Sequence, residues 1–402
     1  MTDVVIVGAG PVGLLLASLL SRRGFHVLVL EQKQFRDKAS NAIGISPPSL
    51  DLLSTIGLAE PLLLWGAAIR KVVVHGSQGR HLGDVSFADL PPPHNCILAV
   101  PQSVTESLLE QHLAAEPLAR IEYGWEFVSL DQDDESVTLV FHDTAGNPRV
   151  ERSSFVVGCD GVRSRVREAI DLGRRPKKFD STFLMGDFPD NTTWGNEAHL
   201  FFTADGAVES FPLGQSRRRW IVQTPSYQDE PGDYLETEVE KRTGHRLEST
   251  ACTWKSPFGI NRWVSGHYAF GRVYLAGDSA HQMSPIGGQG MNTGFADAEH
   301  LAALLQVRRD HPTYASEEGN QWYSRIRRKA ARTAAARAEL SMAVGTIRGR
   351  RSWWRNRLLS FALKRFPQFF PERYAMLTIP YCKFSDAQKR HPRIFSLYKE
   401  TL

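Results

Sequence analysis

Residues 2–31 read TDVVIVGAGPVGLLLASLLSRRGFHVLVLE. The β-branched run at 4–7 predicts a buried parallel strand, and the stretch at 14–23 predicts a helix. A second apolar strand is expected at 27–30, and it ends in Glu31. A strand, a glycine-rich turn, a helix and a strand that ends in an acid are typical of a dinucleotide-binding unit.

The turn between the first strand and the helix reads GAGPVG. Gly8 permits a tight turn, Gly10 lets the backbone approach a pyrophosphate, and Gly13 lets helix and strand pack closely. Pro11 and Val12 lie in the same turn, where the helix N-terminus offers unpaired N–H groups to phosphates. A turn that only packs the helix against the strand is the structural alternative. The same fingerprint serves NAD and FAD, so it does not identify the dinucleotide.

Two later strand ends each carry an aspartate. At 155–167 the sequence reads FVVGCDGVRSRVR, where a β-branched strand is followed directly by Asp160. At 271–299 it reads GRVYLAGDSAHQMSPIGGQGMNTGFADAE, where an apolar strand is followed by Asp278 and a loop rich in proline and glycine. A helix is expected to begin after this loop, near Gly290.

Together these motifs resemble those of the class A flavoprotein monooxygenases, the family of para-hydroxybenzoate hydroxylase and related phenol, quinone-biosynthesis and polyketide hydroxylases. The resemblance implies an α/β fold with a Rossmann-like FAD-binding domain, an inserted antiparallel β-sheet substrate domain and a C-terminal helical segment. It also implies FAD as the cofactor and NAD(P)H as a transient reductant. Gly8, Gly10 and Gly13 would then hold the FAD pyrophosphate, and Glu31 the adenosine ribose.

The later motifs acquire roles from the same resemblance. Asp160 would brace the pyrophosphate region, Asp278 would bind the ribityl and pyrophosphate side, and Gln102 would contact the ribityl chain. The carbonyl of Pro285 would accept a hydrogen bond from the reactive flavin, which makes Pro285 the candidate catalytic residue. The loop and helix start expected to wrap the isoalloxazine ring also include Gly288, Gln289, Gly290, Met291 and Asn292.

One position departs from the family pattern. The family often has an arginine near 41–45, where it helps to neutralise the pyrophosphate, and this chain has Asn41 instead. Either Arg36 or Lys38 takes its place, or FAD is bound more weakly than is usual.

The activity implied by the resemblance is hydroxylation of an aromatic or polycyclic small molecule with NAD(P)H and O2, through a flavin C4a-hydroperoxide. The sequence has no second glycine fingerprint, so NAD(P)H is expected to dock transiently. Two other functions stay open: an FAD-dependent reductase or dehydrogenase that inserts no oxygen, and a non-catalytic flavin-bound redox sensor. A flavin-dependent halogenase is disfavoured, because the WxWxIP motif is missing.

The motifs must converge on one cofactor, so the expected FAD-binding domain is discontinuous and comprises residues 1–70, 98–180 and 267–345. The expected substrate domain comprises residues 71–97 and 181–266, where short alternating stretches predict an antiparallel sheet. Alternation places His199 and Phe201 on one face of a strand, and Ser210 and Phe211 on opposite faces of the next. Residues 346–402 are expected to form a C-terminal helical region.

Composition excludes several classes of protein. The 402 residues are 42% hydrophobic and 23% charged, which is typical of a globular protein rather than a disordered chain, collagen or a coiled coil. The net charge of +4 is too small to indicate a nucleic-acid partner. Between Arg325 and Arg365, however, thirteen Lys and Arg residues stand against one acid. A helical cap that packs its aromatic side chains on the body is the favoured interpretation, and contact with a membrane surface is the less favoured one.

Cysteine and histidine spacing argues against metal sites and a disulfide framework. Cys96, Cys159, Cys252 and Cys382 lie far apart without a CxxC pair, and the thirteen His residues include no HExxH motif. A reducing, cytoplasmic location is therefore expected, with no metal. The apolar run at 4–20 lacks a basic region before it and contains three glycines, so it does not predict a signal peptide or membrane anchor.

Overall fold

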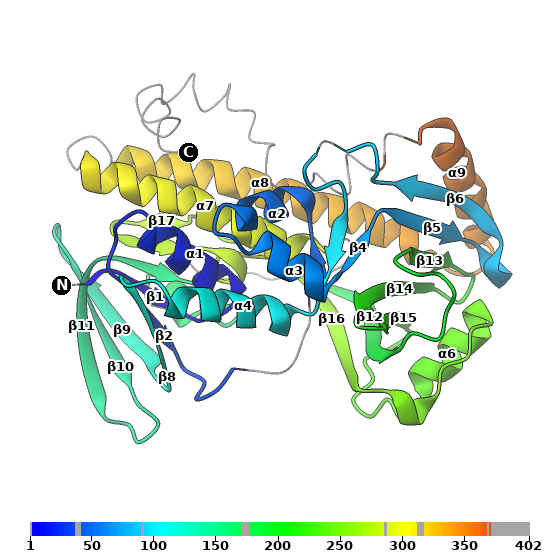
Figure 1. Ribbon diagram of the computed structural model, residues 1–402, viewed down its shortest axis with the longest axis horizontal. Coiled ribbons are helices and arrows are strands. Elements are labelled where there is room, and N and C mark those ends of the chain that lie inside the picture. Colours follow the sequence, from blue (N-terminus) through cyan, green and yellow to red (C-terminus); the bar gives the residue numbers. More distant parts are fainter. Residues whose placement is uncertain are drawn as a thin grey trace.

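A mainly parallel sheet forms one half of the molecule, on the left in Figure 1. The computed structural model describes residues 2–36, 42–90, 92–170, 177–284, 288–311, 317–367 and 370. The parallel strands run in the order β18, β11, β1, β2 and β8, with bounds Val273–Leu275, Pro148–Gly158, Thr2–Val7, Val27–Glu31 and Ala119–Tyr123. Three antiparallel strands extend this sheet: β9 (Glu126–Gln132), β10 (Val137–His142) and β17 (Ala269–Phe270).

Helices cover the parallel sheet, and the largest apolar core lies between these layers. Val4, Val5 and Ile6 of β1 are completely buried, as expected for a parallel strand covered on both faces. The covering helices and the shorter ones nearby are α1 (Pro11–Ser21), α2 (Pro47–Ser54), α3 (Ala59–Trp65), α4 (Gln102–Ala114), α5 (Arg165–Ala169) and α7 (Gln289–Asp310). Helix α1 begins three residues earlier than the apolar run predicts, because proline is compatible with the first turn of a helix.

A second sheet forms the other half of the molecule, in the order β19, β16, β12, β15, β14, β13, β5 and β6. Its pairings are antiparallel except for β13 with β5, which is parallel. The bounds in chain order are β5 (Lys71–His75), β6 (His81–Ser86), β12 (Lys177–Pro189), β13 (Ala198–Phe202), β14 (Ala207–Gly214), β15 (Arg217–Thr224), β16 (Trp254–Val264) and β19 (His281–Gln282). The predicted combination of a Rossmann-like sheet with an inserted antiparallel sheet is confirmed.

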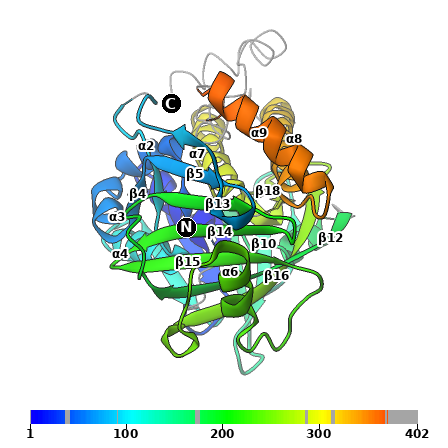
Figure 2. The ribbon, with the colours of Figure 1, turned by 90° about the vertical axis from the view of Figure 1, so that its right-hand side faces the viewer.

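Smaller elements connect and cover the two sheets. A three-stranded sheet of β3 (Gly44–Ile45), β7 (Ile97–Ala99) and β4 (Ala67–Ile69) lies between them. Helix α6 (Tyr234–Thr243) packs on the outer side of the second sheet (Figure 2). Helix α8 (Glu317–Gly345) is long and runs beside both sheets (Figure 1).

The C-terminal helix α9 (Arg351–Arg365) packs on β6 through Leu359 and Leu363. The expected packing of its aromatic side chains on the body is wrong for Trp354 and Phe361, which are both 63% exposed. Leu359 and Leu363 face inward instead, and the buried guanidinium of Arg355 donates to three backbone carbonyl groups. In the ranges that the structure describes, no helix has the length and apolar character needed to cross a bilayer.

Candidate functional site

One cavity of about 1310 Å³ connects the carboxyl ends of the parallel strands with the inner face of the second sheet. Its glycine end is lined by Gly8, Gly10, Glu31, Asp160 and Asp278, and its sheet end by Leu200, Glu209, Phe211, Ile221 and Phe258. Ligand sites usually occupy about 300–1,000 Å³, so this cavity has room for a dinucleotide together with a second molecule.

The three predicted motifs meet at the glycine end because their strands are neighbours. Val7 at the end of β1 pairs with Gly158 at the end of β11, and Gly158 pairs with Leu275 at the end of β18. Ligands of open α/β sheets bind outside the carboxyl ends of such strands. Residues separated by more than a hundred positions in the sequence therefore line one site.

Each glycine of the first turn has a separate geometric reason. Gly8 has φ +108°, and a Cβ there would lie 2.5 Å from the carbonyl oxygen of Cys159. A Cβ on Gly13 would lie 2.2 Å from the carbonyl oxygen of Gly8, so this glycine lets α1 approach the turn. A Cβ on Gly10 would meet no protein atom within 4 Å, and Gly10 lines the cavity. The fold therefore needs glycine at Gly8 and Gly13, whereas Gly10 keeps space open for a ligand.

Glu31 supports the turn from the end of β2. Its carboxylate accepts hydrogen bonds from the backbone N–H groups of Ala9 (2.8 Å) and Lys33 (3.0 Å). A carboxylate has about four acceptor positions, so it can still accept hydrogen bonds from the hydroxyl groups of a ribose. Glu31 also lines the cavity, which leaves it accessible to such a ligand.

Asp160 and Asp278 provide acceptors on the cavity wall. Oδ2 of Asp160 accepts a hydrogen bond from the N–H of Val166 at 3.1 Å, whereas the buried Oδ1 has no partner among the described residues. Burial raises the pKa of both carboxyls, and His281 partly opposes this rise in pKa at Asp278. The buried Oδ1 of Asp160 and the exposed carboxylate of Asp278 can both accept hydrogen bonds from a ligand with several hydroxyl groups, such as FAD. These residues therefore fit the expected cofactor.

The start of α7 closes the same end of the cavity. Its N-cap, Gly288, has φ +64°, and no side chain caps the helix, so the first N–H groups are available to an acceptor. Asn292 donates to the carbonyl groups of Gly44 and Gly288, and its Oδ1 accepts from the N–H of Ser46. The side chain of Asn292 thus orders this wall, which leaves backbone N–H groups as the ligand contacts.

Gln102 begins α4 and lines the cavity as well. Its Oε1 accepts from the N–H of Ala42 at 3.1 Å, and its Nε2 donates to Glu106 at 2.8 Å. Arg36, one proposed replacement for the family arginine, lines the cavity and forms an ion pair with Glu110 at 3.1 Å.

Most of the residues predicted to bind the cofactor line this cavity. Those with a place in its wall are Gly8, Gly10, Pro11, Val12, Glu31, Gln102, Asp160, Asp278, Gly288, Gln289, Gly290, Met291 and Asn292. Gly13 lies behind the turn and packs α1. Pro285, Lys38 and Asn41 lie outside the described residues, so their expected roles stay predictions.

A buried ionic cluster behind this wall was missed in the sequence. Asp297 of α7 accepts from His281 at 2.8 Å, from Arg327 at 2.6 Å and from the N–H of Gly277 at 3.0 Å. His281 is completely buried and does not line the cavity, so it has a structural role in this cluster. The sequence does offer one signal. Asp297 lies eight positions after the start of a largely buried helix, and a buried acid usually has a partner.

Two further contacts hold the second and third motifs together. Arg167 is buried and donates to the carbonyl groups of Val162 and Ser279, which joins the two aspartate motifs. Val12 packs against Gly277 and Gly294, and a Cβ on Gly294 would lie 2.5 Å from the Val12 side chain. These contacts join loops that are far apart in the sequence, so local sequence patterns do not predict them.

The sheet end is mostly apolar, but two charged side chains from the described strands of the second sheet are exceptions. Leu200, Phe211, Ile221 and Phe258 line it, and Met185 continues this wall on β12. The first exception is Arg219, which is completely buried and forms a bidentate ion pair with Asp187 at 2.6 and 2.9 Å. The second exception is Glu209, opposite Leu200 and Ile221 in the sheet register.

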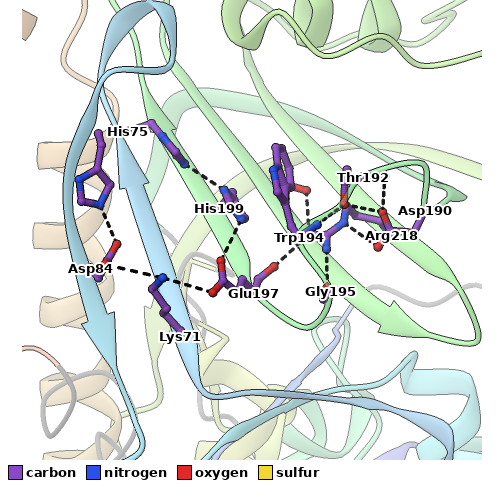
Figure 3. Close-up of polar contacts among 12 residues, drawn as sticks. Lys71, His75, Asp84, Asp190, Thr192, Trp194, Gly195, Glu197, His199 and Arg218 are labelled. Carbon is purple, nitrogen blue, oxygen red and sulfur yellow. Dashed lines mark hydrogen bonds and ion pairs between the residues drawn. The ribbon is translucent and has the colours of Figure 1, made fainter.

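The outer face of the same strands carries a polar cluster (Figure 3). Nε2 of His75 and Nδ1 of His199 are 2.9 Å apart, and the ring of Trp194 stacks on His199 at 3.8 Å. Burial lowers the pKa of both histidines, and that of His199 falls to about 3. The expected pairing of His199 with Phe201 on one face is confirmed, and this face points away from the cavity.

Comparison with known proteins places these features among flavoproteins. The family model described as FAD binding domain matches residues 1–338. An uncharacterized aromatic compound monooxygenase of Bacillus subtilis is 33% identical over 309 residues, which are 75% of this chain and 61% of the relative. Rifampicin monooxygenase of Streptomyces venezuelae is 31% identical over 318 residues, which are 77% of this chain and 65% of the relative. The chain therefore spans less than two thirds of the length of these curated relatives.

A solved structure has the same fold over nearly the whole described chain. The crystal structure of p-nitrophenol 4-monooxygenase from Pseudomonas putida DLL-E4 matches with a TM-score of 0.83 and 24% sequence identity. The match covers 90% of this chain and 94% of that chain. The two proteins therefore share their fold.

Proposed function

The chain belongs to the FAD-binding domain family, and from this premise we propose that it is an FAD-dependent monooxygenase. It uses NAD(P)H and O2 to hydroxylate an aromatic or polycyclic small molecule. The observation that carries the proposal is the continuity of the cavity, which joins a dinucleotide-binding edge to an apolar sheet face. A cofactor at the dinucleotide-binding edge and a substrate at the sheet face would share one continuous space.

At the glycine end, the turn from Gly8 to Gly13 holds the FAD pyrophosphate and Glu31 the adenosine ribose. Asp160 would brace the pyrophosphate region, Asp278 would bind the ribityl and pyrophosphate side, and Gln102 would contact the ribityl chain. The N–H groups at the start of α7 would face the ring. When bound, the flavin supplies the electron transfer from NAD(P)H and the activation of O2. The carbonyl of Pro285 remains the proposed contact to the reacting atoms.

At the sheet end, the apolar wall favours a flat and apolar substrate. Phe211 and Phe258 provide aromatic surfaces, and aromatic rings stack or pack edge to face on such residues. The names of the relatives, which refer to rifampicin and to aromatic compounds, support a substrate of this class. The proposed division is into an FAD-binding domain (1–70, 98–180 and 267–345), a substrate domain (71–97 and 181–266) and a C-terminal helical region (346–402).

The test begins with the purified full-length chain. We expect bound FAD, oxidation of NADH or NADPH that accelerates with an aromatic substrate, and transfer of one atom of heavy-isotope O2 into the product. NAD(P)H-dependent reduction of the substrate without oxygen transfer would identify a dehydrogenase instead. Bound FAD without turnover across a panel of phenols and polycycles would support a redox sensor.

A further inference from the structure

Glu209 is a carboxylate in the apolar wall of the sheet end. It belongs to β14, in which Ala207, Glu209 and Phe211 line the cavity while Val208 and Ser210 face the other way. Its neighbours in the sheet are Leu200 on β13 and Ile221 on β15. Neither of these neighbours can form a hydrogen bond with the carboxylate through its side chain.

No described residue forms a hydrogen bond or ion pair with the Glu209 side chain, although Glu209 is half-buried and lines the cavity. Removal of water around the carboxylate raises the pKa of Glu209 to about 7. A half-buried carboxylate without a protein donor in a ligand cavity indicates that the ligand supplies the donor.

The other charged groups near the sheet end do not neutralise Glu209. Arg219 of β15 faces the same cavity, but its guanidinium is held by Asp187. Arg337 of α8 also lines the cavity, and its side chain is engaged in an interaction of its own. The outer face of the strands carries further charged or titratable groups, which include His75, His199, Arg218 and, from α6, Glu238 and Arg242. Strands β4 and β7, which also touch β14, carry none.

We propose that Glu209 binds the hydroxyl group of a phenolic substrate and accepts its proton. This inference rests on the proposed function, and it narrows the substrate class to aromatic molecules with an acidic O–H group. In the step, the phenolic O–H bond breaks, an O–H bond forms on the Glu209 carboxylate, and no electron is transferred. The resulting phenolate is more electron-rich than the phenol, which favours attack by an electrophilic oxygen.

The experiment uses the full-length, FAD-loaded protein and two probes of nearly equal shape. The first is 4-methylphenol, which stays neutral in solution around pH 7, and the second is 4-methylanisole, which lacks the O–H group. Calorimetry gives both dissociation constants at pH values below and above 7, for the wild type and for Glu209→Gln. Glu197→Gln is the matched control, because Glu197 carries the same group on the outer side of the same sheet (Figure 3).

We expect the wild type to prefer 4-methylphenol by about tenfold or more above pH 7, since a hydrogen bond to a charged acceptor is stronger than one to a neutral acceptor. This preference decreases below pH 7, where Glu209 is protonated. Glu209→Gln loses the pH dependence, Glu209→Asp recovers part of it, and Glu197→Gln behaves as the wild type does.

A preference that is independent of pH, or that persists in Glu209→Gln, would overturn the inference, and so would the absence of binding of 4-methylphenol at every pH. The proposed function fails separately, since it requires bound FAD and oxygen transfer. Normal pH-dependent binding without oxygen transfer would retain the carboxylate subsite and reject the monooxygenase. Circular dichroism and the FAD content of each variant show whether it has folded.

Discussion

At the glycine end of the cavity the backbone itself forms the wall, whereas at the sheet end the wall consists of side chains. A Cβ on Gly8 or Gly13 would collide with main-chain atoms, which cannot move aside. Leu200, Phe211 and Ile221 instead project from strands that stay paired whatever side chain they carry. The glycine end therefore tolerates few substitutions, whereas substitutions at the sheet end can change the shape and chemistry of the cavity within the same fold.

The largest effect on stability is expected at a residue of the sheet end that, unlike its neighbours there, is needed for the fold. Arg219 lies at the sheet end, yet Arg219→Ala leaves the carboxylate of Asp187 buried without its partner. Loss of one partner of a buried ion pair costs about 3–5 kcal/mol, so the free energy of unfolding in urea should decrease by this amount. The double variant Asp187→Asn, Arg219→Met should recover much of the loss. Equal stability of Arg219→Ala and the wild type would refute a structural role for the pair.

The glycine end is tested by two substitutions of the same kind. In Gly13→Ala, the new methyl group would overlap the carbonyl of Gly8, and such overpacking costs about 1–3 kcal/mol. In Gly10→Ala, the methyl group meets no protein atom, so the fold should keep its stability while FAD binding weakens. Thermal unfolding of the apoprotein and FAD titration separate the two effects. Equal losses of stability in both variants would contradict the assignment of Gly10 to ligand contact.

On the outer face of the second sheet, the buried side chain of His199 should make the stability of the fold depend on acid. The pKa of His199 is about 3 in the folded chain and about 6.5 in an unfolded one, so acid protonates the unfolded state first. Stability is therefore complete above about pH 6.5 and decreases as the pH falls towards 3, by about 1–2 kcal/mol at pH 5. Unfolding measured across this range should show a shallower decrease in His199→Gln. An unchanged slope would show that other groups control acid unfolding.

The smallest effect on stability is expected on the inner face of the same sheet. Phe211 is only partly buried because one side of its ring faces the cavity. Phe211→Leu should therefore change stability by less than about 1.5 kcal/mol and leave FAD content unchanged, since the swap keeps an apolar side chain. Affinities for a series of aromatic ligands of increasing size should shift instead. Loss of FAD in this variant would show that the two ends of the cavity are not independent.

Much of the glycine end could be predicted because its signals are local. A tight turn needs glycine at Gly8 through its own φ angle, and parallel strands place their carboxyl ends together once their order is known. The buried cluster around Asp297 could not be predicted in the same way. Its partners, His281 and Arg327, come from a loop and another helix, and only packing brings them within hydrogen-bond distance.

The sequence by itself determined the order of the motifs, the βαβ unit and the sheet built of alternating strands, because each depends on neighbouring residues and on backbone geometry. FAD rather than NAD followed from the family resemblance. Only the tertiary structure decided which face of the second sheet encloses the cavity. Alternation tells which residues share a face, as for His199 and Phe201, but both faces of these strands carry apolar side chains. The face covered by α6 and Trp194 became the outer one, and Glu209 was thereby left in the cavity. This outcome depends on packing between segments far apart in the chain, which no local pattern records.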